Sequence, residues 1–142
     1  MDVREVKAVV LEAVSDLAEV LAVYLFGSVG EGRASRRSDL DLAVLFADDI
    51  GPDRRLELRL ELRARLASAT KGPVDVIPLN GAHPSIAFRA IRGRLLVDRD
   101  PVKRSLYVAR TISRYHDYRR FLRQHVPSVE ARAREGRLGA AR

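Results

Sequence analysis

The sequence predicts an α+β (mixed α/β) protein, in which helices flank a small mixed sheet of three to four strands and a long helix follows near the C-terminus. Short apolar runs at 21–26, 40–46 and 74–77 are each bordered by Gly, Pro or Asp, which is typical of strands. Segments with helical spacing or helix-forming composition separate these runs. A charged segment at 101–126 carries an apolar stripe and completes the expected architecture.

The first third of the chain predicts one helix and two strands. Asp2 begins a capping-box pattern, and apolar residues at helical spacing predict a helix over roughly 3–18. The run 21–26 is apolar throughout and stops at Gly27, so we expect a buried strand in the middle of the sheet. Residues 40–46 form the second expected strand.

The segment 53–69 gives two conflicting signals. Four of its leucine residues alternate with Glu and Arg, which is the period of a strand. Its composition is nevertheless dominated by Leu, Glu, Arg and Ala, which are strong helix formers, and no β-branched residue occurs before Thr70. Pro52 and Asp53 also suit the start of a helix, so we expect a helix here.

The remaining segments predict two short strands and two helices. Residues 74–77 form a short apolar strand, 84–92 a short helix, and 95–97 are consistent with a fourth strand. Asp100 is a suitable N-cap for a long helix over 101–126.

The composition is that of a globular domain rather than of a disordered protein, with 46% hydrophobic and 32% charged residues among 142. We expect one domain over 1–126, which includes the helix 101–126, and a basic, mobile tail over 127–142. The absence of cysteine excludes disulfides and thiolate zinc sites. No apolar run is long enough to span a bilayer and the charged N-terminus is unlike a signal peptide, so a cytoplasmic protein without membrane contact is expected.

The net charge of +7 is unevenly distributed. Residues 1–100 carry 15 basic and 16 acidic residues, whereas 101–142 carry 11 basic and 3 acidic residues. A basic face attracts nucleic acid or an acidic protein partner. A solvated helix face with a charged tail explains the same pattern equally well, so nucleic acid is expected at most as a secondary partner.

The most informative stretch joins two of the apolar runs. It begins with Gly27 and Ser28 at the end of one run and closes with Asp39 and Asp41 at the start of the next. Because alternate residues of a strand point to the same face, the two carboxylates should project side by side, which suits a divalent metal. Asp75 lies on the next apolar strand and faces away from its apolar neighbours. The Gly-Ser turn can present backbone N–H groups to phosphate.

This order of Gly-Ser, ten intervening residues, Asp-Leu-Asp and a later Asp on an apolar strand resembles the nucleotidyltransferase superfamily typified by DNA polymerase beta. The small size resembles its minimal nucleotidyltransferase (MNT) members, antitoxins that are commonly encoded beside HEPN-domain ribonuclease toxins. The resemblance covers roughly residues 3–125 and implies the nucleotidyltransferase fold. It also implies an enzyme that uses Mg²⁺ and transfers AMP from ATP to a tyrosine hydroxyl of a cognate HEPN toxin, which neutralises the toxin.

The resemblance further implies roles for individual residues. Asp39, Asp41 and Asp75 would bind Mg²⁺ and act in catalysis. The residues expected to bind the nucleotide are Gly27, Ser28, Arg33, Arg37 and Ser38. Glu31 departs from the family pattern, in which a basic residue often stands at this position.

Two other functions stay open at this point. The chain could act as a non-catalytic antitoxin that blocks the HEPN toxin by forming a complex, with its basic helix and aromatic stripe as the partner surface. Transfer to a small molecule, as in aminoglycoside nucleotidyltransferases, is less expected, because those enzymes usually carry an additional substrate-binding region.

Overall fold

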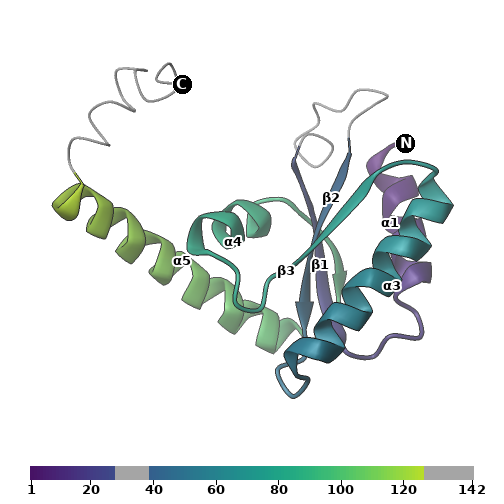
Figure 1. The fold of residues 1–142 in the computed structure, drawn as a ribbon, viewed down its shortest axis with the longest axis horizontal. Coiled ribbons are helices and arrows are strands. Elements are labelled where there is room, and N and C mark those ends of the chain that lie inside the picture. Colours follow the sequence, from purple (N-terminus) through teal and green to yellow (C-terminus); the bar gives the residue numbers. More distant parts are fainter. Residues whose placement is uncertain (28–38, 127–142) are drawn as a thin grey trace.

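The structure is a computed structural model that describes residues 1–27 and 39–126 (Figure 1). In chain order its elements are α1 (Val3–Ala13), β1 (Val20–Phe26), β2 (Leu40–Phe46), α3 (Pro52–Thr70), β3 (Val74–Pro78), α4 (Pro84–Ile91), β4 (Arg94–Asp98) and α5 (Pro101–His125). Every expected element is present, and all except the first helix begin and end within one residue of the prediction. The expected tail over 127–142 lies outside the described residues.

The four strands form one mixed sheet in the order β3-β2-β1-β4. Strand β1 pairs antiparallel with both β2 and β4, and β2 pairs parallel with β3. A parallel pair requires a crossover connection, and α3 lies in that connection. The prediction of a small mixed sheet in an α+β fold is therefore confirmed, and β1 is a central strand as expected.

Helices cover both faces of the sheet, with α1 and α3 on one face and α4 and α5 on the other (Figure 1). Alternation along β2 sends Leu42 and Val44 into the first layer and Ala43 and Leu45 into the second. By the same alternation Asp41 belongs to the second face. The acidic end of β2 therefore opens on the side of the sheet that carries α4 and α5.

Helix α3 resolves the conflict between the two signals in its sequence. Leu58, Leu62 and Leu66 recur every fourth residue and are buried against the sheet. In a strand, Leu56 and Leu60 would lie on the same face as Leu58 and Leu62, but each of them is 52% exposed. Composition thus predicted this element correctly, and the alternating leucines did not indicate a strand.

Helix α1 is shorter than predicted and ends at Ala13. Val14 and Leu17 are buried, so the apolar pattern indicated their burial correctly but the continuation of the helix wrongly. The chain continues in a tight turn, in which the Leu17 N–H donates to the Val14 carbonyl. Arg65 donates to the carbonyl of Ala13 and Arg99 to that of Val14. These side chains from distant elements satisfy carbonyls that a longer helix would have bonded itself.

Arg99→Met is expected to lower the free energy of unfolding by about 1–3 kcal/mol, because three carbonyls each lose a charge-assisted hydrogen bond at once. The Arg99 guanidinium donates to the carbonyls of Val14, Leu17 and Val20. Urea unfolding measures the change. Arg63→Met, at an exposed position of α3, is the control and should shift stability by less than about 0.5 kcal/mol. Equal midpoints for the two variants would contradict a stabilising role of Arg99.

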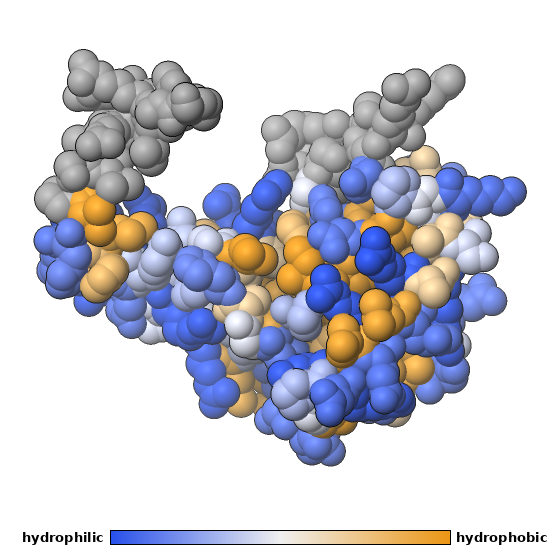
Figure 2. Space-filling view, in the orientation of Figure 1, coloured by the Kyte–Doolittle hydropathy of each residue, from blue (hydrophilic) through white to orange (hydrophobic). Residues whose placement is uncertain are grey.

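Helix α5 is fixed to the body by aromatic side chains. The Tyr107 hydroxyl donates to the Leu79 carbonyl at 2.9 Å, and the ring of Tyr115 stacks on Phe88 with centroids 3.9 Å apart. The last turns of α5 extend beyond the body (Figure 1), and apolar side chains lie exposed at this end (Figure 2), where Phe121 is 52% exposed. Among residues 1–27 and 39–126, no helix combines the length and the apolar character needed to cross a membrane.

Candidate active site

The carboxylates predicted from the sequence lie at one end of the sheet. Asp41 and Asp75 are register partners in the parallel pair of β2 and β3, so their side chains leave the same face of neighbouring strands. Asp39 lies directly before β2, two residues ahead of Asp41. Asp39 and Asp75 are exposed and Asp41 is half-buried, so solvent and ligands reach all three.

The three carboxylates influence one another electrostatically. Burial raises the pKa of Asp41 above its usual range, and the negative charges of Asp75 and Asp39 raise it further. The positive charge of Arg89 acts in the opposite direction and lowers the pKa. A divalent cation held between these groups would relieve the repulsion, as expected of a metal-binding site.

The carboxylates are close enough to interact but do not form a closed metal cage. Within the described parts of the chain, no group of three or more acidic or histidine side chains is gathered tightly enough to hold a metal ion by itself. Mg²⁺ is commonly bound by one or two carboxylates together with water and substrate phosphates. The open arrangement of Asp41 and Asp75 therefore fits Mg²⁺ that arrives with a nucleotide better than a permanent structural metal.

Gly27 lies directly beside Asp41. Its φ is +75°, a left-handed conformation that favours glycine, and a Cβ atom at this position would collide with a carboxylate oxygen of Asp41. Phe26, the preceding residue, is the register partner of Asp41 across β1 and β2. The turn after β1 thus brings backbone, rather than a side chain, against the acidic cluster, which consists of Asp39, Asp41 and Asp75.

Four of the residues predicted to bind the nucleotide lie outside the described residues. These are Ser28, Arg33, Arg37 and Ser38, and the unusual acid Glu31 lies there too. Their roles stay predictions.

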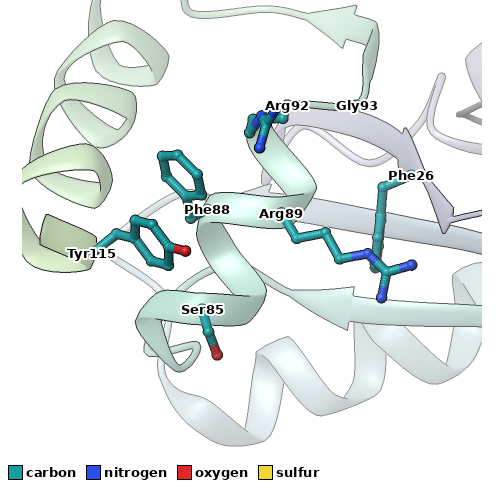
Figure 3. Close-up of a pocket in the computed structure, with 7 residues that line it drawn as sticks. All are labelled: Phe26, Ser85, Phe88, Arg89, Arg92, Gly93 and Tyr115. Atoms are coloured by element: carbon teal, nitrogen blue, oxygen red, sulfur yellow. The ribbon is translucent and has the colours of Figure 1, made fainter. Parts of the chain in front are cut away.

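A pocket of about 450 Å³ (Figure 3) reaches Phe26, the residue of β1 that pairs with Asp41. Its walls come from β1, α4, the turn after α4, and α5; the lining residues are Phe26, Ser85, Phe88, Arg89, Arg92, Gly93 and Tyr115. Figure 3 shows two pairs of side chains in it, Phe88 with Tyr115 and Arg89 with Phe26. The sequence analysis did not identify this pocket. The sequence shows that Ser85, Arg89 and Arg92 share one face of a helix. It does not show that this face lies beside Phe26.

The geometry agrees with comparisons to known proteins. The profile of the polymerase beta nucleotidyltransferase family matches residues 10–102. The chain is 33% identical over 103 residues to the protein adenylyltransferase MntA of Shewanella oneidensis, covering 70% of this chain and 69% of MntA.

Solved structures give the same picture. A toxin–antitoxin structure with AMP-PNP matches with a TM-score of 0.73 and 27% identity, over 87% of this chain and 98% of the other. A complex of tri-AMPylated Shewanella oneidensis HEPN toxin with its MNT antitoxin matches with a TM-score of 0.67 and 25% identity, over 87% and 95%. The resemblance inferred from the Gly-Ser and Asp-Leu-Asp pattern is thereby confirmed, and the chain belongs to the polymerase beta nucleotidyltransferase family.

Proposed function

We propose that this chain transfers AMP from ATP to a tyrosine hydroxyl of a cognate HEPN toxin in the cytoplasm, and thereby acts as its antitoxin. The observation that supports this most strongly is the meeting of Gly27, Asp41 and Asp75 at one end of the sheet, in a chain similar to MntA. MntA is named a protein adenylyltransferase, and a similar solved complex pairs an MNT antitoxin with an AMPylated HEPN toxin.

In this proposal Asp39, Asp41 and Asp75 hold one or two Mg²⁺ ions. Bound Mg²⁺ neutralises phosphate charge and aligns the attacking and leaving oxygens. The donor set suits it, because all three side chains offer hard carboxylate oxygens whose mutual repulsion a divalent cation relieves. Gly27 leaves the space beside Asp41 free of a side chain, so that phosphate oxygens can approach.

The acceptor is proposed to enter from the open edge of the sheet. The acceptor oxygen forms a bond to the α-phosphorus, the bond from that phosphorus to the oxygen bridging the β-phosphate breaks, and pyrophosphate leaves. Asp75 is exposed on the edge strand β3, where a side chain of another protein can reach it. Its carboxylate is thus suited to accept the proton that the acceptor hydroxyl loses. Ser28, Arg33, Arg37 and Ser38 are proposed to contact the triphosphate.

The test is transfer of AMP to the HEPN protein encoded beside this chain. With ATP and Mg²⁺, the intact mass of that protein should increase by whole AMP units, and chelation of Mg²⁺ should abolish the increase. Asp39→Asn combined with Asp41→Asn should reduce the rate at least ~10³-fold. Asp49→Asn, an exposed acid at the opposite end of β2, is the matched control and should leave the rate unchanged. An equal mass increase with the double variant would rule out this site.

A second candidate function is neutralisation of the toxin by binding alone. It is favoured by α5, which carries seven Lys or Arg residues and one Asp and extends beyond the body (Figure 1). In that case the carboxylate double variant would still neutralise the toxin. Charge reversal at the exposed Arg119 and Arg123, near the end of α5, would instead abolish neutralisation. The carboxylate site on the sheet makes the catalytic proposal the stronger one.

A further inference from the structure

Arg89 reaches from α4 to the end of β1 that carries the acidic cluster. Its guanidinium carbon lies 5.9 Å from the centroid of the Phe26 ring, within the range of a cation–π contact. Phe26 precedes Gly27 and is the register partner of Asp41. Figure 3 shows Arg89 directed toward Phe26 and away from Phe88 and Tyr115. The guanidinium therefore lies at the side of the pocket that adjoins the carboxylates.

The helix that carries Arg89 is held closely against β1. Ala87 and Ala90 are fully buried, and Gly93, just beyond the helix, is so close to the Leu25 carbonyl that a Cβ atom would collide with it. His83 caps the N-terminus of α4 by accepting a hydrogen bond from the Ser85 N–H. A tightly seated helix fixes the point from which the Arg89 side chain starts, and Phe26 supports its far end.

Arg89 and Asp75 lie on opposite sides of Asp41. Asp75 is the register partner of Asp41 on the edge strand β3, and Phe26, whose ring lies next to the Arg89 guanidinium, is the register partner of Asp41 on β1. Strand β2 lies between β3 and β1, so a negative charge at Asp75 and a positive charge at Arg89 flank Asp41. An anion held at Asp41 by a divalent cation would meet Arg89 on the side away from the edge strand.

The chemistry of arginine suits a phosphate at this position. A guanidinium presents a planar fork of donors that matches two phosphate oxygens, and stacking on an aromatic ring orients that fork in advance. Metal ions bound by three carboxylates neutralise a polyphosphate only in part, so a further cation on the opposite side lowers the remaining charge.

We propose that Arg89 binds the phosphates of the nucleotide, on the side of Asp41 that faces the pocket under α4. This inference rests on the proposed function for the identity of the nucleotide as ATP. It adds a phosphate-binding residue that lies far from the Gly-Ser loop in sequence, and it predicts that nucleotide affinity depends on α4.

The test compares Arg89→Gln with Arg92→Gln by calorimetric titration with ATP and with adenosine. Arg92 lies one turn further along α4, with its guanidinium 5.6 Å from the Phe88 ring, and loses the same charge when replaced. Arg89→Gln is expected to weaken ATP binding roughly 10–100-fold, as for loss of a charge-assisted hydrogen bond, and to leave adenosine binding unchanged. Arg92→Gln should weaken ATP binding less than about threefold. Arg89→Lys should restore part of the loss.

Three results would overturn the assignment of Arg89. They are unchanged ATP affinity in Arg89→Gln, equal weakening of ATP and adenosine, and an equal loss in Arg92→Gln. Since Arg89 is exposed, its replacement should leave the melting temperature within about 2 °C.

Failure of the Arg89 assignment can be distinguished from failure of the proposed function. Arg89-dependent ATP binding without AMP transfer would retain the site and reject the proposed reaction, whereas AMP transfer with Arg89-independent ATP binding would do the reverse.

Discussion

Asp41→Asn is expected to reduce AMP transfer by at least roughly 10³-fold, because several kcal/mol of charge stabilisation depend on the metal that Asp41 is proposed to hold. The same change should make the metal-free protein more stable at pH 7. Burial and the charges of Asp75 and Asp39 raise the pKa of Asp41, so the folded state disfavours its ionised form. Removing the ionisable group removes that cost. The melting temperature should rise by about 2 °C, a modest amount because solvent screens a partly exposed carboxylate.

The pH dependence of the free energy of unfolding tests the sign of this stability change. A carboxyl whose pKa is raised on folding contributes stability below its unfolded pKa and loses that contribution as pH rises through the folded pKa. The stability difference between Asp41→Asn and the unchanged protein should therefore grow as pH rises from about 4 and level off near neutrality. Differential scanning fluorimetry across this range, in chelator, measures it. Added Mg²⁺ should stabilise the unchanged protein and not the variant. A variant less stable than the unchanged protein at pH 7 would contradict the electrostatic account.

Gly27→Ala is expected to cause the second large effect. The left-handed φ of +75° disfavours any Cβ by about 1–2 kcal/mol, and the added methyl group would also displace the carboxylate of Asp41. A displacement near 1 Å at a reacting centre costs roughly 10²-fold in rate. Both unfolding and AMP transfer should therefore be affected, and they are measured by urea denaturation and by transfer kinetics.

Gly81 offers a matched control for this change. Its φ is +77°, almost the same as that of Gly27, but an added Cβ would meet no atom within 4 Å. Gly81→Ala should therefore lose a similar amount of stability to backbone strain while keeping its transfer rate. Equal rate losses in the two variants would show that backbone strain, and not contact with Asp41, explains the effect of Gly27→Ala.

Local signals in the sequence were sufficient for most of the fold. Strand ends are marked by Gly, Pro and Asp, and the composition of α3 outweighed its alternating leucines because Leu, Glu, Arg and Ala favour a helix wherever packing permits. The early end of α1 could not be predicted in this way. It coincides with hydrogen bonds from Arg65 and Arg99, which lie far along the chain and donate to the carbonyls of Ala13 and Val14.

The same distinction applies to the site. The placement of Asp41 and Asp75 on one face follows from alternation along two strands, which the sequence shows directly. Arg89 could not be identified, because its position depends on how α4 packs across β1. A ligand-binding residue that lies on a separately packed helix carries no periodic signal that links it to the Gly-Ser and Asp-Leu-Asp motif.

The most direct test of the account is the position of the metal. Crystals grown with Mn²⁺ and a non-hydrolysable ATP analogue should show anomalous density within coordination distance of the carboxylate oxygens of Asp39, Asp41 and Asp75. The phosphates of the analogue should contact the same metal and lie beside Gly27. Metal bound elsewhere, or nucleotide bound with no metal at these carboxylates, would contradict the assignment of this end of the sheet as the site of AMP transfer.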